Sequence, residues 1–176
     1  MMTLEAQQRG LLALIKNRGA SPADPYLRQL QGSPQLAMVR EIALWWRMFA
    51  LEAQCRFTSR LLQRSRIFQK TVASYFDNHP TSPFVEELSA DFLHSLCAHP
   101  DPLLRAVSQS ERALLQCKAG SNDAVEIIWN RHPDRVFQAL QDGSELPPVE
   151  AECIYRLKID RDLRGMVACI RETVLR

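Results

Sequence analysis

The residues closest to a ligand-binding motif are a short run of histidine and cysteine. His94, Cys97 and His99 form the pattern H-x-x-C-x-H, whose side chains are of types that bind zinc. On a helix the first two share a face, but His99 does not continue it, and no second ligand group follows at zinc spacing. We therefore predict no metal site in this chain.

Motifs that would give the chain a catalytic centre are missing from the sequence. It contains no nucleophile elbow, no H-E-x-x-H and no phosphate-binding glycine loop, and it has only six glycines. We therefore predict no catalytic residue and no cofactor in this chain. A site assembled in the fold from scattered histidines and carboxylates stays open as a weaker hypothesis.

Basic side chains recur with helical spacing in the first half of the chain. Arg56, Arg60 and Arg64 lie four residues apart, so they project from one face of a helix. Such a stripe suits an acidic protein surface, the phosphates of a nucleic acid, or the chain's own acidic segment. Trp45 and Trp46 precede the stripe. Core packing is the favoured interpretation for each tryptophan considered singly, but two successive residues of a helix cannot both face one core. The residues that we predict to bind a partner protein are Trp45, Arg56, Arg60 and Arg64.

Near the C-terminus, the strand pattern from residue 153 to 159 offers a second candidate surface. Apolar residues occupy the odd positions, while Arg156 and Lys158 lie on the opposite face. A small sheet with a free edge can accept an extended peptide as an additional strand. The alternative is a strand whose edge is already covered. The predicted peptide-binding residues are Ile154, Arg156, Lys158 and Arg171, with the basic side chains selecting acidic residues of the peptide.

The predicted partner-binding surface must lie on helices. Amphipathic spacing predicts a helix over residues 3–17 with Thr3 as its N-cap, and a long helical stretch from 35 to about 62, either continuous or bent. Further helix starts are predicted at Ser82-Pro83 and Asp101-Pro102, where a capping residue precedes a proline. The apolar stripe expected to face a core in the long stretch consists of Leu36, Val39, Ile42, Trp46, Phe49 and Leu51.

The pattern changes after residue 120. Alternation predicts strands at Val125–Trp129 and Cys153–Ile159, and Met166 to Arg171 can return as a third strand. The predicted fold is mainly α, with a helical body at residues 1–120 and a small C-terminal α/β module at 121–176. This module carries a sheet of about three strands.

Composition and charge limit the class of protein. The 176 residues are 46% hydrophobic and 24% charged, which excludes a mainly disordered chain, and no apolar run is long enough to span a membrane. The five cysteines are widely spaced and no secretory signal is evident, so we expect a cytoplasmic protein without disulfides.

The net charge of +2 conceals a polarised chain. Residues 1–72 hold 11 Lys and Arg against 4 Asp and Glu, residues 73–155 hold 5 against 13, and residues 156–176 hold 6 against 3. The polarity indicates that one face of the protein meets a charged partner.

Several short motifs carry a family resemblance that would cover most of the chain. They are Trp45-Trp46-Arg47, Cys55-Arg56-Phe57, Ile127-Ile128-Trp129-Asn130-Arg131-His132-Pro133-Asp134, Tyr155-Arg156-Leu157 and Arg161-Asp162-Leu163-Arg164-Gly165. In these motifs and in its layout the chain resembles MbnC-type subunits of methanobactin biosynthesis. The resemblance implies a heterodimer with a TIM-barrel oxidase that holds the iron. This chain would help to bind the leader of a ribosomally made precursor peptide, whose cysteine becomes an oxazolone with an adjacent thioamide.

Two main hypotheses follow. In the first, the chain is a non-catalytic, peptide-recognising subunit of a peptide-modifying oxidase, with the oxidase and the precursor peptide as partners and with no membrane contact. The product would be a copper-chelating modified peptide. In the alternative, which we favour less, it is a helical nucleic-acid-binding regulator that uses the arginine stripe, and its binding would depend steeply on salt.

Overall fold

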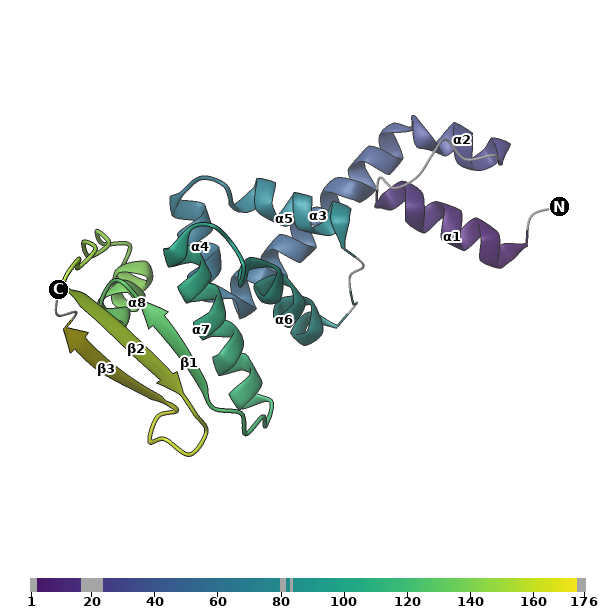
Figure 1. Cartoon of the computed structure of the whole chain (residues 1–176). Coiled ribbons are helices and arrows are strands. Elements are labelled where there is room, and N and C mark those ends of the chain that lie inside the picture. Colours follow the sequence, from purple (N-terminus) through teal and green to yellow (C-terminus); the bar gives the residue numbers. More distant parts are fainter. Residues whose placement is uncertain (1–2, 17–23, 80–81, 83, 174–176) are drawn as a thin grey trace. The chain divides into compact units, whose positions relative to one another are not determined.

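The computed structural model describes residues 3–16, 24–79, 82 and 84–173. Within these residues the chain forms seven helices and then a small three-stranded sheet, whose first two strands are joined by an eighth helix (Figure 1). The predicted fold class, mainly α with a C-terminal three-stranded module, is confirmed. In the described part of the chain no helix is both long and apolar enough to cross a membrane. The elements are α1 (Leu4–Ile15), α2 (Pro25–Gln31), α3 (Pro34–Gln54), α4 (Arg56–Arg64), α5 (Phe68–Asn78), α6 (Val85–Leu96), α7 (Pro102–Lys118), β1 (Val125–Trp129), α8 (Pro133–Asp142), β2 (Cys153–Ile159) and β3 (Val167–Thr173).

Packing divides the chain into two compact units. The first unit comprises residues 1–50 and 69–81, and the second comprises residues 51–68 and 82–176. The predicted boundary at residue 120 lies inside the second unit, where α7 packs against β1. Packing does not test which segments fold alone, so the domains 1–120 and 121–176 stay a prediction.

In the first unit, α1 and α2 pack around a small apolar cluster of Leu14, Leu27 and Leu36. The Thr3 hydroxyl accepts the N–H of Ala6 at 3.3 Å, which confirms the predicted cap of α1. Gly10 lies against Leu27, and an added Cβ would collide with that side chain. The close approach explains a glycine in the middle of this helix.

The apolar stripe predicted for α3 is largely uncovered. Leu36 and Leu51 are buried, but Val39, Ile42 and Phe49 are between 44% and 54% exposed. The expectation that the tryptophans pack in a core is wrong, because Trp45 and Trp46 are each 58% exposed. Periodicity identifies an apolar face without identifying what covers it.

In the second unit, a buried carboxylate fixes the start of α4. The stretch predicted as one or two helices is two, because α3 ends at Gln54 and α4 begins at Arg56. Glu111 of α7 is 5% exposed and accepts the N–H groups of Phe57 and Thr58, each at 2.7 Å. It thus satisfies two amides that the first turn of a helix leaves without partners.

The predicted helix start at Asp101 is confirmed, whereas the one at Ser82 is wrong. Asp101 Oδ1 accepts the N–H groups of Leu103 and Leu104. The N-cap of α6 is Phe84, without a side-chain hydrogen bond. Ser82 instead accepts the N–H of Phe84 in a turn and donates to Glu87, and Pro83 lies outside the described residues.

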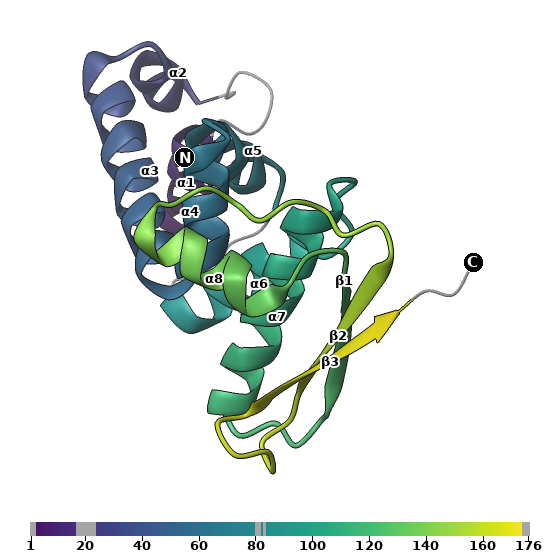
Figure 2. The same cartoon turned by 90° about the vertical axis from the view of Figure 1, so that its left-hand side faces the viewer.

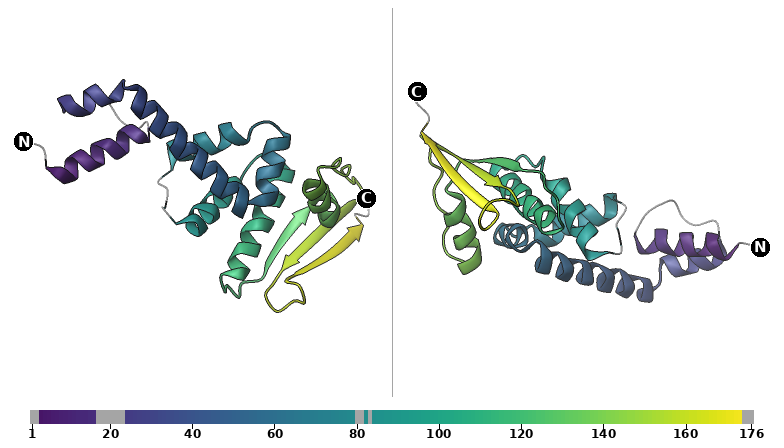
Figure 3. Two further views of the ribbon diagram at one scale, coloured as in Figure 1. Left: turned by 180° about the vertical axis from the view of Figure 1, so that it is seen from behind. Right: turned by 90° about the horizontal axis from the view of Figure 1, so that it is seen from below.

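The sheet has the order β1-β2-β3 and is antiparallel throughout. The strands predicted at Val125–Trp129 and Cys153–Ile159 are confirmed, and the third runs from Val167 to Thr173. One face is buried and lies towards α7 and α8 (Figure 2). β1 and β3 form the two edges, with β3 the more distant from α7 (Figure 3). The largest buried side chains of the inner face are Ile127, Trp129, Tyr155, Leu157 and Ile159.

Candidate functional site

The outer face of the sheet carries the first of the predicted peptide-binding cations, and it is already paired. Arg156 lies between Glu126 of β1 and Glu172 of β3, at 2.6 Å and 2.8 Å. These carboxylates raise the pKa of the Arg156 guanidinium. An incoming peptide carboxylate would have to compete with both.

Lys158 and Arg171 have partners within the protein as well. Lys158 Nζ lies 3.0 Å from Asp160 Oδ2. Arg171 donates to Glu150 at 3.3 Å and to the Cys153 sulfur at 3.1 Å. Each of the predicted peptide-selecting cations thus has an acidic neighbour.

Glu150 also accepts the hydroxyl hydrogen of the buried Tyr155 at 2.7 Å. This hydrogen bond lowers the pKa of Glu150 and raises that of Tyr155. The group composed of Glu150, Cys153, Tyr155 and Arg171 therefore joins the end of β2 to β3 and to the preceding loop.

Two arginines of the predicted stripe hold the end of α8. Arg60 donates to the carbonyl oxygens of Leu140 and Gln141 at 3.0 Å and 2.7 Å, and Arg64 donates to that of Ser144. These carbonyls belong to the helix end or just follow it, where cations are favourable. Arg56 and Arg64 are both exposed, and of these two only Arg64 holds α8 through a hydrogen bond, so Arg56 is the member of the stripe that we expect a partner to contact.

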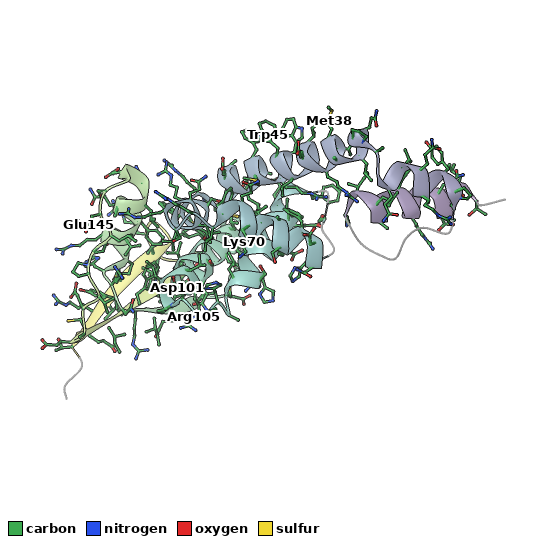
Figure 4. The ribbon with its side chains drawn as sticks, turned by 90° about the horizontal axis from the view of Figure 1, so that it is seen from above. Met38, Trp45, Lys70, Asp101, Arg105 and Glu145 are labelled. Carbon is green, nitrogen blue, oxygen red and sulfur yellow. The ribbon has the colours of Figure 1, made fainter. Side chains whose placement is uncertain are left out.

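A continuous apolar surface, the α3 stripe, lies on the exposed face of α3. Met38 and Trp45 project from the same side of the helix (Figure 4). The rings of Trp45 and Phe49 stack with centroids 5.9 Å apart, and the Trp46 ring meets both edge-on. Exposed apolar patches of this kind mark interaction surfaces. The α3 stripe consists of Met38, Val39, Ile42, Trp45, Trp46 and Phe49, each at least 44% exposed.

The site that sequence reasoning missed is the free edge of β1. β1 pairs with β2 on one side, and no described strand pairs with its other side. α7 lies beside this edge (Figure 1). An unpaired edge presents N–H and C=O groups that a further strand can bind.

Two adjoining hollows follow this edge, and together we name them the β1 groove. The Arg105 hollow, about 550 Å³, is lined by Arg105, Ala106 and Ile128 among others, and Ile154 is its only predicted peptide-binding residue. The Arg112 hollow, about 250 Å³, is lined by Arg112, Ala113 and Val125 among others. Both hollows share Gln109, Glu126 and Ile127.

Walls of opposite character enclose the β1 groove. Its α7 wall contributes arginines and small residues, and its β1 wall contributes apolar side chains and Glu126. The signal available in the sequence was the recurrence of Arg105, Gln109 and Arg112 on one face of α7. Its meaning depends on β1 lying opposite, which the sequence does not specify.

The histidine and cysteine motif does not converge on one point. His94 and Cys97 line the Arg112 hollow, whereas His99 Nδ1 accepts the N–H of Asp101 at 3.1 Å. Burial raises the pKa of the Cys97 thiol, and the neighbouring Arg112 partly opposes this. Among the described residues no three His, Cys, Asp or Glu side chains group to hold a metal ion.

No protein-family model, curated protein or solved structure matches this chain.

Proposed function

We propose that this chain is a non-catalytic, peptide-recognising subunit of a peptide-modifying oxidase that acts in the cytoplasm. It binds the leader of a precursor peptide, and a partner oxidase holds the iron and modifies a cysteine of that peptide. The family resemblance suggests this assignment, and two surfaces of the chain support it.

The observation that carries the proposal is the unpaired edge of β1 facing a groove. A peptide added along β1 gains backbone hydrogen bonds, while alternate side chains enter the hollows beside α7. The groove is apolar where Ala106, Ala113 and Ile127 line it. In this arrangement a flexible peptide can bind as an extended strand.

The α3 stripe supports the second half of the proposal. Stable protein interfaces are enriched in tryptophan, phenylalanine and methionine at their centres. The stripe brings these residue types together on one helix, and Arg56 follows shortly after on α4. In this proposal the oxidase covers the stripe.

Filling the β1 groove tests peptide binding. Gln109 lines both hollows, so Gln109→Trp should block strand addition and weaken binding of a labelled precursor peptide at least tenfold. Gln138, exposed on α8, gives the matched control Gln138→Trp, which should leave affinity unchanged. Fluorescence anisotropy measures both. Equal affinities for the two variants would remove peptide binding from this groove.

Two steps test the complex: a search of the neighbouring genes for a TIM-barrel oxidase and a short cysteine-containing peptide, and co-expression of such an oxidase and peptide with this chain. The expected result is a stoichiometric complex containing iron, and a mass change at a cysteine of the peptide only when both chains are present. Trp45→Ala should weaken the complex at least tenfold. Tyr26→Ala, which removes another aromatic ring that is 58% exposed, should not. An oxidase that modifies the peptide equally well alone would refute the proposal.

A further inference from the structure

The β1 groove has an unequal distribution of free charge. On its β1 wall, Glu126 shares Arg156 with Glu172, at 2.6 Å and 2.8 Å. On its α7 wall, Arg105 is exposed, and no ion pair joins it to any described residue. Arg112 lies against the Cys97 thiol, a weak and neutral partner. The charged residues of the groove walls are thus two arginines on α7 against one glutamate on β1, so the net charge of the groove is positive.

The two arginines are spaced to reach two positions of one added strand. They are seven residues apart on α7, which is about 10.5 Å along the axis and nearly the same face. The Arg105 hollow includes Trp129, and the Arg112 hollow includes Val125. Residues opposite these two positions are four apart in the added strand, about 13 Å. Arginine side chains are long and flexible enough to bridge the mismatch between the spacing along α7 and the spacing along the strand.

The side of the strand that meets these arginines follows from the pleat. Val125, Ile127 and Trp129 alternate with Glu126 and Ile128, and Ile127 and Trp129 are buried on the α7 side. A peptide residue directly opposite each of them points to the same face. The central residue of the three then lies beside Ile127 and Gln109, which line both hollows.

We propose that the β1 groove selects a strand with carboxylates at two positions four residues apart and an apolar residue midway between them. Arg105 and Arg112 bind the carboxylates, and the apolar residue lies beside Ile127 and the side-chain stem of Gln109, which line both hollows. This inference rests on the proposed function, because it specifies the peptide that the groove accepts.

Two short synthetic probes test this selection with the full chain. The first is fluorescein-labelled Thr-Glu-Val-Leu-Val-Glu-Thr, whose symmetry makes the result independent of strand direction. The second replaces both glutamates with glutamine. At low salt we expect the acidic probe to bind at least tenfold more tightly by anisotropy, with the advantage shrinking as salt screens the charges.

Variants assign the selection to the two arginines. In Arg105→Gln/Arg112→Gln the two probes should bind equally, at the affinity of the glutamine probe for the unaltered chain. Arg135→Gln, which removes an exposed arginine of α8, should keep the tenfold preference. Retention of the preference in the double variant would overturn the assignment.

The outcomes separate this inference from the proposed function. Suppose that both probes bind the unaltered chain equally and that Gln109→Trp abolishes this binding. That result would overturn charge selection and leave peptide binding in the groove intact. No binding of either probe or of the precursor peptide would overturn both.

Discussion

Glu111 shows how much one side chain contributes in this protein. Its carboxylate comes from α7 and accepts two amide hydrogens at the start of α4. Because α7 is also one wall of the β1 groove, Glu111 ties the groove to the helix that carries Arg60. Burying this carboxylate costs desolvation free energy, but removing it would leave its two amide partners without an acceptor, which costs more.

Glu111→Ala should destabilise the fold by about 1–3 kcal/mol or more, because it leaves two buried amides without an acceptor. The free energy of unfolding in urea measures the loss. Glu52→Ala is the control, since Glu52 is exposed and accepts its hydrogen bond from the exposed Gln63. A Glu111→Ala protein as stable as this control would contradict the capping role.

The same residue gives a pH dependence of known sign. Burial raises the pKa of Glu111 above its ordinary value of 4.5, despite the hydrogen bonds that oppose the shift. The folded state therefore holds the proton more tightly than the unfolded state. Stability from this group is present below pH 4.5 and is lost as pH rises through the raised pKa. As pH rises across that window, the free energy of unfolding of the unaltered protein should fall relative to that of Glu111→Gln. A relative increase would show that the pKa of Glu111 is lowered.

Single residues also show the limits of prediction from sequence. The caps at Thr3 and Asp101 were predictable, because their partners lie two or three residues away. The ion pairs of Arg156 were not, because Glu126 and Glu172 become its neighbours only through the sheet register. The cations of the predicted basic face are present, but each has an acidic neighbour, and for Arg156 both neighbours come from other strands.

Among the elements, α4 and α8 depend on each other through the arginine stripe. Arg60→Ala should destabilise the protein by about 1 kcal/mol, since it removes two hydrogen bonds to carbonyls near the end of α8. Arg56→Ala, from the same stripe but exposed, should change stability by less than about 0.5 kcal/mol. Thermal unfolding of the two variants is the comparison. Equal losses of stability in the two variants would refute the stabilising role of Arg60 at the end of α8.

The end of α4 contains a residue in a left-handed conformation. Arg66 has φ 57°, and the N–H of Ile67 reaches back to the carbonyl of Leu62, a helix ending that favours glycine. Arg66→Gly should raise stability by up to about 1 kcal/mol, because it relieves the steric cost of this conformation. Arg66→Ala keeps that cost and should show no gain in the midpoint of urea unfolding. A gain in both variants would place the effect elsewhere.

The strands were more predictable than the packing of α3. Alternation over Cys153–Ile159 reflects burial of one face only, and the structure buries that face. The periodicity of α3 is equally clear, yet most of its stripe is exposed. An apolar helix face predicts that something covers it, and a single sequence does not say whether that cover belongs to the same chain.

At the scale of the whole molecule, the α3 stripe and the β1 groove belong to different compact units. We therefore expect the two binding activities to be separable. Trp46→Ala/Phe49→Ala should weaken the oxidase complex at least tenfold and leave peptide affinity within twofold, whereas Gln109→Trp should do the reverse. Anisotropy and analytical size exclusion give the two affinities. Loss of both activities in either variant would show that the surfaces are coupled.

The order of helices and strands could be predicted, whereas the β1 groove could not. Each wall is an ordinary piece of secondary structure, and the site exists only because α7 lies beside an edge that no described strand occupies. Of the predicted peptide-binding residues, Ile154 alone lines it. Proximity between segments is a property of the tertiary fold.

The opposite edge of the sheet has a practical consequence for handling the protein. Among the strands that the structure describes, β3 pairs with β2 alone, and its exposed residues include Ile170, Arg171, Glu172 and the thiol of Cys169. Charged residues on an edge strand hinder edge-to-edge aggregation, and salt weakens that protection. Purification and storage at low salt with a reducing agent therefore preserve both safeguards, the charged side chains of the edge and a thiol that has not cross-linked two molecules.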